Sequence, residues 1–568
     1  MKKDCVSSTS RLPRLLTLLL FLLLTATGGF AQAQAAPKIG PGLAPIQQYI
    51  ATAWDTLTRS MSECGSIVDP KIKAAHVLYL PADFPVPPAV EKLHSECKVQ
   101  IEHLPKVLHG LGEIDTTKFQ PHGLLYLPNK YVVPGGRFNE MYGWDSYFII
   151  RGLVRANRLE LAQGIIENFF FEIEHYGAFL NANRTYYLTR SQPPFLSSMV
   201  MSVYEAEKQA GKADPTWLAR AYAYVSRDYQ LWVHTPHLAG DTGLSRYYDF
   251  GDGPPAEAIQ DESGFYRKVI AYFLLHPEGA DHYLIDHPPN AQVNSVGANY
   301  TITLCDAPTT MARVDCEAKR TVSLSPDYYR GDRSMRESGF DVSFRLGPFS
   351  AATHHYAPVC LNSLLYKTET DLQQMAEILG KAEEAAEWKT RAGTRKIAMN
   401  QYLWSAEWGK FVDYDFQNGV QSAYPYATMF YPLWAGIATP EQAVGILRNL
   451  GSLEQPGGVA MSAFDSGGQW DFPYGWAPLQ LIAVEGMRRY KFNPEADRVS
   501  TEFLSTVADN FRKEGTIHEK YDVLTRSWQT KVEAGYQMNV VGFGWTNGVF
   551  LELLHQLPKT SVDKLERQ

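Results

Sequence analysis

The chain has 568 residues, a formal net charge of −8, and 45% hydrophobic and 20% charged residues. This composition is typical of an ordinary soluble globular protein, and the length suits one large helical domain or two ordinary domains rather than one compact β domain. Because the chain is mildly acidic, we exclude nucleic acid and anionic membrane surfaces as expected partners. Aromatic residues make up 12% of the chain. They fill cores and also stack on sugar rings, so their excess mildly favours a carbohydrate site.

The first 35 residues predict an export signal. Four basic residues precede position 15, the run from 15 to 24 is apolar apart from Thr17, and small residues follow around Ala33. This run is short for a membrane span, so we expect residues 1–35 to be removed as a signal peptide, leaving a secreted or periplasmic protein without membrane attachment. A retained membrane anchor is the alternative. Removal would take the net charge from −8 to −11, since the segment carries four basic residues and one acidic residue.

Apolar residues recur at helical spacing through most of the chain, in segments joined by loops rich in Gly, Trp and Asp. The predicted helices cover residues 46–61, 147–176 (with a break near 156–157), 197–210, 215–233, 356–379, 382–404, 427–435, 440–450, 476–490, 496–512 and 544–557. Helices in successive pairs favour an all-α fold, an (α/α)6 toroid in which loops at one end of the helices form a pocket. A plain irregular helical domain is the alternative, because the pattern alone does not separate the two.

Residues 277–329 differ from the helical remainder. They are rich in Pro, Asn and Gly and contain the strand-like pieces 300–304 and 320–324. We interpret them as a small β-rich insertion in one domain that covers residues 36–568. The insertion is either decoration or a flap over the pocket.

The cysteines allow disulfides without determining their connectivity. Cys64 could pair with Cys97, and Cys305 with Cys316. Cys360 lies in an apolar helical stretch, and we expect it to be a small buried hydrophobic residue rather than a nucleophile. The sequence contains no Cys/His cluster with zinc spacing, no EF-hand loop and no Walker loop.

The segment from 134 to 147 carries the most chemistry. Its Pro-Gly-Gly start predicts a sharp turn, so the residues that follow are presented from a loop. They are Arg137, Glu140, Tyr142, Trp144 and Asp145. Aromatic rings beside carboxylates and a guanidinium suit a sugar ring, with stacking on its apolar face and hydrogen bonds to its hydroxyls. For Asp145 alone, a role as helix N-cap is an equally good interpretation.

A second segment, 467–480, repeats this combination. Glycines that break regular structure precede Trp470, Asp471 and Trp476, and the segment opens a predicted helix. One such loop is a weak signal. Two loops with the same chemistry, far apart in the sequence, favour one shared pocket.

Both segments resemble the two signature motifs of the trehalase family, in the same order and at similar spacing. Further stretches also resemble the family: 181–195, 244–249, 519–522 and 542–548. The resemblance runs from about residue 110 to the C-terminus, excluding much of 277–329. It implies an (α/α)6 barrel that hydrolyses α,α-trehalose to two glucose molecules with inversion, using two carboxylates and no metal or cofactor. We expect a monomer whose partner is this disaccharide.

The resemblance implies roles for individual residues. The general acid falls on Asp341, in Glu337-Ser-Gly-Phe-Asp341, and the general base falls on Glu519, in Glu519-Lys-Tyr-Asp522. In an inverting site the two carboxyl groups should stand roughly 6.5–9.5 Å apart, so that a water fits opposite the leaving group. The implied sugar contacts are Arg137, Phe138, Trp144, Asp145, Asn181, Arg190, Gln192, Glu257 and Trp470.

The sequence departs from the family pattern at several positions. The family commonly has Gly-Pro-Arg-Pro-Glu where this chain has Gly253-Pro-Pro-Ala-Glu257, so an arginine is missing. We expect Arg333 or Arg336 to supply its charge. Phe340 replaces the usual Trp before the acid. Further departures are Tyr474 in place of Asn, and a changed stretch at 532–537 in which Glu533 could replace a loop acid.

Three other functions remain open from the sequence. The first is hydrolysis of a different α-glucoside, which the departures would support. The second is a trehalose-binding protein without turnover, which the presence of both Asp341 and Glu519 opposes. The third is a polysaccharide lyase on a helical toroid, which would need a different base and cations for uronate groups.

Overall fold

The computed structural model describes residues 42–68, 75–119, 121–257, 264–278, 281–287, 300–303 and 319–567. The predicted signal segment and the pair Cys305 and Cys316 lie outside these ranges. The described residues belong to a unit that runs from Lys38 to Gln568. Among them, no helix is both long enough and apolar enough to cross a membrane.

Within the described ranges, six helices form a closed inner ring. They are α4 (Asp145–Arg155), α6 (Leu196–Gln209), α11 (Val359–Ile378), α13 (Tyr431–Ala435), α15 (Ala477–Arg489) and α17 (Gly544–Gln556). Each packs against the next, and α17 returns to α4. These helices bury nearly continuous stretches, such as Ala477–Val484 in α15, because neighbours surround them on most sides.

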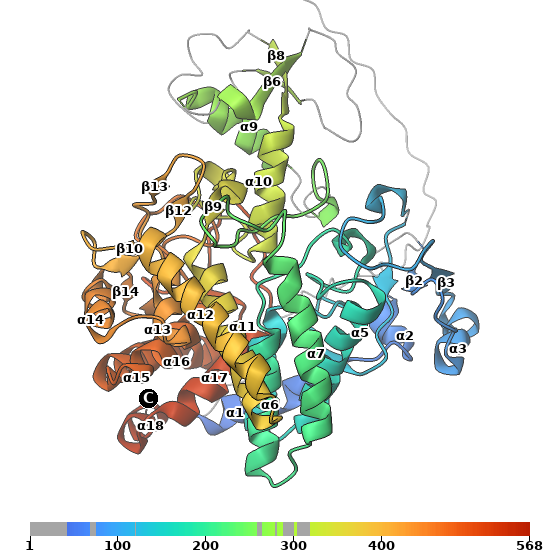
Figure 1. The fold of residues 1–568 in the computed structure, drawn as a ribbon, viewed down its shortest axis with the longest axis horizontal. Coiled ribbons are helices and arrows are strands. Elements are labelled where there is room, and N and C mark those ends of the chain that lie inside the picture. The colour runs from blue at the N-terminus through green and yellow to red at the C-terminus, as the bar shows by residue number, and fades with distance from the viewer. Residues whose placement is uncertain are drawn as a thin grey trace, which may run out of the picture. The chain divides into compact units, whose positions relative to one another are not determined.

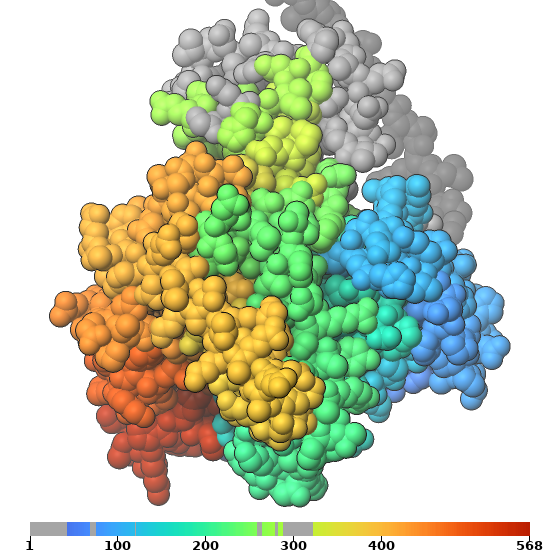
Figure 2. All heavy atoms as spheres, in the orientation of Figure 1, coloured from blue at the N-terminus to red at the C-terminus, as the bar shows by residue number. Residues whose placement is uncertain are grey.

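A second set of helices lies outside this ring. They are α1 (Ala44–Thr56), α5 (Leu159–His175), α7 (Pro215–Trp232), α12 (Ala382–Tyr402), α14 (Pro440–Arg448) and α16 (Asn493–Glu514). Helix α5 packs on α4 and α6, α7 on α6 and α11, α12 on α11, and α16 on α15 and α17. Figure 1 shows α7 and α12 in front, and Figure 2 shows their side chains covering this face. The predicted all-α fold of (α/α)6 type is confirmed.

Local signals in the sequence set the helix ends. Helix α7 begins after Asp214, whose carboxylate accepts a hydrogen bond from the Thr216 backbone at 2.8 Å, and Pro215 occupies the first helical position. Helix α14 begins with a capping box between Thr439 and Gln442. Such residues satisfy the free N–H groups of a first turn, and therefore the predicted and observed starts agree closely.

Among the residues that the structure describes, five α-helices lie outside the predicted set: α2 (Cys64–Ile67), α3 (Pro88–Cys97), α9 (Phe265–Leu275), α10 (Pro326–Glu337) and α18 (Lys559–Glu566). Helix α10 has few apolar residues, and it buries Asp332, Arg333 and Arg336 as well as them. Other segments compensate these charges, as where Arg333 pairs with Asp249 at 3.1 Å. A helix whose buried face is charged depends on such partners and is invisible to hydrophobic periodicity.

The β-rich insertion forms a three-stranded antiparallel sheet. Its central strand is β8 (Lys319–Leu324), flanked by β6 (Leu284–His287) and β7 (Tyr300–Thr303), so the predicted strand pieces near 300 and 320 are found (Figure 1). Helices α9 and α10 share a small hydrophobic cluster with this sheet, which includes Phe273 and Tyr328. The insertion therefore rests on the two helices that flank it in the sequence.

The remaining strands are short and connect loops of the barrel. A parallel sheet contains β3 (Gln100–His103), β2 (Val77–Leu80) and β4 (Leu124–Leu125). One antiparallel sheet has three strands, with β12 (Tyr414–Asp415) between β9 (Tyr356–Ala357) and β13 (Val420–Gln421). The other strands form antiparallel pairs: β1 (Thr58–Arg59) with β5 (Tyr131–Val132), β10 (Trp404–Ser405) with β11 (Lys410–Phe411), β14 (Glu454–Gln455) with β15 (Gly458–Val459), and β16 (Tyr474–Trp476) with β17 (Lys520–Asp522).

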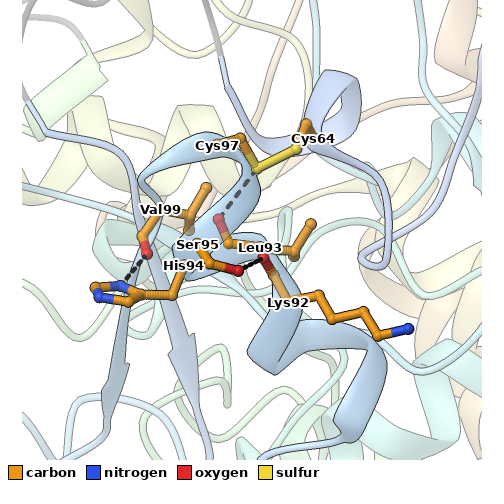
Figure 3. Close-up of a disulfide and its surroundings, with 7 residues drawn as sticks. All are labelled: Cys64, Lys92, Leu93, His94, Ser95, Cys97 and Val99. Atoms are coloured by element: carbon orange, nitrogen blue, oxygen red, sulfur yellow. Dashed lines mark hydrogen bonds between the residues drawn. A yellow bond between two sulfur atoms is a disulfide. The ribbon is translucent and has the colours of Figure 1, made fainter.

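One of the two allowed disulfides is present among the described residues. Cys64 in α2 is bonded to Cys97 at the end of α3, with Cα atoms 5.9 Å apart (Figure 3). Cys360 forms no disulfide and is buried, as predicted.

Replacing Cys97 by Ser is expected to lower the free energy of unfolding by about 2–4 kcal/mol, because the bond closes a loop across 33 positions and restricts the unfolded chain. Urea denaturation of the wild-type and variant proteins measures the difference. The Cys64→Ser variant and the double variant are the controls, and both should match the single change. A double variant that loses twice as much would show that the two thiols contribute separately.

Candidate active site

A cavity of about 580 Å³ opens at the N-terminal ends of the inner helices. The loops that precede α4, α6, α11, α15 and α17 contribute to its wall. The cavity is lined by all eleven residues that the sequence assigned to the site: Arg137, Phe138, Trp144, Asp145, Asn181, Arg190, Gln192, Glu257, Asp341, Trp470 and Glu519. The fold brings together residues that span almost 400 positions of sequence, while their individual roles stay predictions.

Asp341 reaches the cavity from the loop after α10. Gly339 has φ of +76°, and a Cβ there would lie 2.9 Å from the Trp144 indole, so both the turn and the close approach require glycine. The Gln469 side-chain amide donates to the backbone carbonyl of Asp341. The next carbonyl, that of Val342, accepts from the Trp470 backbone N–H at 3.1 Å. The second motif segment thus holds the loop of the predicted acid.

Asp471 of the same segment supports this loop from behind rather than facing the cavity. Its carboxylate accepts from the Phe344 backbone N–H at 2.7 Å and from the Tyr424 hydroxyl at 3.0 Å. Burial raises the pKa of Asp471 to about 6. The two residues of the Trp-Asp pair in the second motif therefore have different positions. Trp470 lines the cavity, and Asp471 holds the backbone of the loop that follows Asp341.

Glu519 is buried, with 2% of its surface exposed, and is held from several directions. The Tyr536 hydroxyl donates to Oε1, and Lys520 Nζ lies 3.6 Å from Oε2. The Trp545 indole N–H donates to the Glu519 backbone carbonyl at 3.1 Å. The β16–β17 pairing places Lys520 opposite Trp476, which joins the second motif to the strand that begins directly after the predicted base.

Asp145 is a third carboxyl group close to these two. Burial raises its pKa well above the ordinary value, and the charges of Glu519 and Asp341 raise it further. A protonated Asp145 can donate a hydrogen bond to a sugar oxygen as well as accept one. The N-cap interpretation is wrong, because Trp144 occupies the N-cap of α4 and Asp145 is the first helical residue.

Arg190 is the centre of a second polar group that lines the cavity. Its guanidinium donates to Asn181 Oδ1 at 2.9 and 3.1 Å, and it pairs with Glu257 at 2.5 Å. Its Cζ atom also lies 4.8 Å from the centre of the Tyr187 ring. Burial alone would raise the pKa of Glu257, but Arg190 and Arg336 outweigh it and lower the pKa. This carboxylate is therefore ionised and able to accept from sugar hydroxyls.

The two arginines proposed to replace the missing one have different positions. Arg336 lines the cavity and pairs with Asp332 at 3.3 Å. Arg333 instead pairs with Asp249 and donates to the Gly253 backbone carbonyl at 2.7 Å, so it holds the loop that leads to Glu257. Of the two candidates, only Arg336 is placed to meet a ligand.

Aromatic rings form a continuous packed wall. The Trp144 ring centre lies 5.5 Å from Phe340, 5.7 Å from Trp470 and 5.8 Å from Trp545. Trp470 stacks on Trp476 at 3.8 Å. Phe340, at the position where the family has Trp, packs on Trp144 and Trp470 but does not itself line the cavity. The wall excludes water and offers flat apolar faces to a sugar ring.

Gln192 lines the cavity and also forms a hydrogen bond to the protein backbone. Its side-chain carbonyl accepts from the Trp144 backbone N–H at 2.9 Å, which ties the first motif to the segment before α6. Its amide nitrogen is the group that remains to donate to a ligand. Gln192 therefore positions Trp144 as well as facing the cavity.

Several lining residues were missed by the sequence reasoning. Tyr536 and Gln537 come from the changed stretch at 532–537, Met538 follows it directly, and Phe265 and Lys268 come from α9. The changed stretch drew attention to Glu533, which also lines the cavity, and the same signal could have marked Tyr536. No motif marks α9, whose position depends on the insertion. Tyr474, another departure from the family pattern, does not line the cavity.

Comparison with known proteins gives consistent matches. The family model described as trehalase matches residues 67–269 and 320–558. The chain is 33% identical over 558 residues to a cytosolic neutral trehalase of Saccharomyces cerevisiae, which covers 88% of this chain and 69% of that protein. It is 35% identical over 459 residues to a cytosolic neutral trehalase of Neurospora crassa, covering 74% of this chain and 57% of that protein.

A solved structure agrees with these matches. The structure of the neutral trehalase Nth1 from Saccharomyces cerevisiae superposes with a TM-score of 0.72 at 31% identity, covering 92% of this chain and 95% of that chain. The matched family segments contain every predicted site residue and leave out most of the β-rich insertion. The chain belongs to the trehalase family.

Proposed function

We propose that the protein hydrolyses α,α-trehalose to two glucose molecules with inversion at one anomeric carbon. The observation that carries this proposal is the convergence of Asp341 and Glu519 on one cavity that also holds Arg190, Asn181 and an aromatic wall. Paired carboxyl groups provide the acid and the base, and the other residues bind hydroxyls and exclude water.

The proposed reaction needs two proton transfers. The Asp341 carboxyl group donates its proton to the bridging oxygen while the bond from that oxygen to the anomeric carbon breaks. A water attacks the same carbon from the opposite face and gives its proton to Glu519, through a transition state with oxocarbenium character. One glucose leaves as the α anomer, and the attacked glucose is released as the β anomer. Solvent then restores both protonation states.

The surrounding contacts support this division of work. The Tyr536 hydroxyl donates to one oxygen of Glu519 and Lys520 Nζ lies 3.6 Å from the other, and both contacts support a set orientation of this carboxylate. Asp145 and Gln192 can donate hydrogen bonds, whereas Glu257 accepts them. A polyhydroxylated ring presents both donors and acceptors, so a mixed set of this kind suits it.

Proton NMR of the protein mixed with trehalose is expected to show α- and β-glucose in equal amounts in the first minutes. Inversion produces one β anomer for each α anomer released, whereas retention would produce α-glucose alone before mutarotation. A boiled sample is the control. Glucose release from maltose or kojibiose that is faster than release from trehalose would favour a different α-glucoside. Tight trehalose binding without glucose would favour a binding protein.

Arg336→Gln is expected to raise the KM for trehalose by about tenfold or more, because it removes a charge-assisted hydrogen bond to the substrate. The kcat should change less, since Arg336 is not one of the two proton-transfer residues. Steady-state kinetics measures both constants. Arg391→Gln, on the exposed surface of α12, is the matched control and should behave as wild type. An unchanged KM in Arg336→Gln would show that this residue does not touch the substrate.

The prediction of a signal peptide and of a secreted or periplasmic location is wrong. The relatives from Saccharomyces cerevisiae, Neurospora crassa and Emericella nidulans are named cytosolic neutral trehalases, and this points to a cytosolic location. The error has a physical reason. An apolar run of about ten residues after basic residues suits several structures besides an export signal, so its length and composition alone do not specify one.

The oligomeric state and the domain organisation also belong to this proposal. Because the chain by itself supplies all eleven predicted site residues, we propose a monomer with one catalytic domain. Trehalose is the proposed partner, and no nucleic acid or membrane is part of the proposed function. The proposed chemistry uses two carboxyl groups and assigns no role to a metal in the reaction.

A further inference from the structure

A cluster of three histidines and one aspartate lies outside the cavity. Asp327 stands in the first turn of α10, His354 and His355 follow one another in the short helix Thr353–His355, and His282 belongs to Asp281–Tyr283 at the start of the insertion. None of the four lines the cavity. Two separate segments of the chain therefore bring imidazole groups to one carboxylate on a third segment.

The distances within this cluster are short. His354 Nε2 lies 2.9 Å and His355 Nε2 lies 3.8 Å from Asp327 Oδ1, and His282 Nε2 lies 3.6 Å from Oδ2. One ligand atom each from Asp327, His354 and His355 can be chosen so that all lie within 4.8 Å of one another. His354 and His355 thus present Nε2 to one carboxylate oxygen of Asp327, and His282 presents Nε2 to the other oxygen.

This spacing suits a tetrahedral transition-metal ion. Bonds of about 2.0–2.2 Å from Zn²⁺ to nitrogen and oxygen ligands place neighbouring ligand atoms roughly 3.4 Å apart. The separations from Asp327 to His354 and His355 lie on either side of that value, and the ligand atoms of these three residues are close enough to share one ion. His282 faces the second oxygen of Asp327 and would join as the fourth ligand after its side chain rotates. Imidazole nitrogens with one carboxylate oxygen form a ligand set that zinc prefers, whereas calcium and magnesium prefer oxygen ligands alone.

We propose that Asp327, His354, His355 and His282 bind one divalent transition-metal ion, with Zn²⁺ as the type case. The exposure of the side chains fits this role, because His354 is 6% exposed at the base of the site while His282 is 54% exposed at its mouth. An ion can therefore reach the site from solvent. It would link the insertion to the first turn of α10, the helix that leads to Asp341. The site is structural, since it lies outside the cavity.

Isothermal titration of tag-free, chelator-dialysed full-length protein with zinc chloride tests the proposal. The expected result is one saturable site per chain, together with a higher midpoint of thermal unfolding when zinc is present. His355→Ala and His282→Ala should each weaken zinc binding by at least about tenfold. His109→Ala, an exposed histidine elsewhere on the chain, is the matched control and should bind as wild type.

The same measurements can overturn the proposal. A wild-type protein without saturable zinc binding would show that the cluster is a hydrogen-bonded group only. Equal binding by the wild type and both histidine variants would place the ion elsewhere. Circular dichroism shows whether each variant is folded, so that weaker zinc binding is not confused with unfolding. His282→Ala is expected to disturb folding least, because the His282 side chain is mostly exposed. Trehalose hydrolysis that follows zinc occupancy in a folded protein would place the metal in the cavity and overturn this assignment.

Discussion

Asp341→Asn is expected to lower kcat for trehalose at least about a hundredfold, because an amide cannot donate a proton to the bridging oxygen. The substitution keeps the volume of the side chain. It also keeps the loop in place, since the bond from Gln469 goes to the backbone carbonyl of Asp341 and not to its carboxylate. A loss of rate with an unchanged midpoint of thermal unfolding is therefore the expected outcome.

A substrate that needs no acid separates the role of Asp341 from a general loss of function. Fluoride leaves without protonation, so α-glucosyl fluoride should be hydrolysed by Asp341→Asn with a much smaller loss than trehalose. Parallel rate measurements with the two substrates give this comparison. Asp241→Asn, an exposed acid away from the cavity, is the matched control. Near-normal trehalose hydrolysis by Asp341→Asn would remove this residue from the role of acid.

Glu519→Gln is also expected to lower kcat for trehalose at least about a hundredfold. The amide cannot take the proton from the attacking water. The buried Lys520 keeps other partners in this variant, namely Gln469 Oε1 at 3.3 Å and the Tyr536 ring at 4.0 Å. We therefore expect the variant to fold, and circular dichroism with thermal unfolding checks this.

A small anion tests the role of Glu519 as a base. Azide attacks without losing a proton, so added azide should restore turnover of Glu519→Ala and yield β-glucosyl azide, which NMR identifies. The same addition should not restore Asp341→Asn on trehalose, where the leaving group still lacks its proton. Glu514→Gln, exposed at the end of α16, is the matched control for the Gln variant. Glucosyl azide with the α configuration would contradict the inverting role.

The motif segments allowed much of the candidate site to be predicted, because each consists of neighbouring residues in a recognisable order. Residues 134–147 and 467–480 both supply cavity-lining side chains. The prediction was less complete where the neighbours in space are distant in sequence. Tyr536 donates to Glu519, and its own segment departs from the family pattern, so its importance depends on a contact that only the folded chain contains.

The sequence by itself determined the helix pairs, the family and the residues with the right chemistry, since these follow from local signals such as the Asp214 cap of α7 and from contiguous motifs. The predicted all-α class and the family are confirmed. Only the tertiary structure decided that Arg336 rather than Arg333 lines the cavity, and that Asp327 meets three histidines. Helix α10 carries all three of these residues: Arg333 and Arg336 lie on a buried charged surface, and Asp327 is partly exposed at the first turn. The energy of such a surface depends on partners supplied by distant segments, and no local pattern in the sequence encodes them.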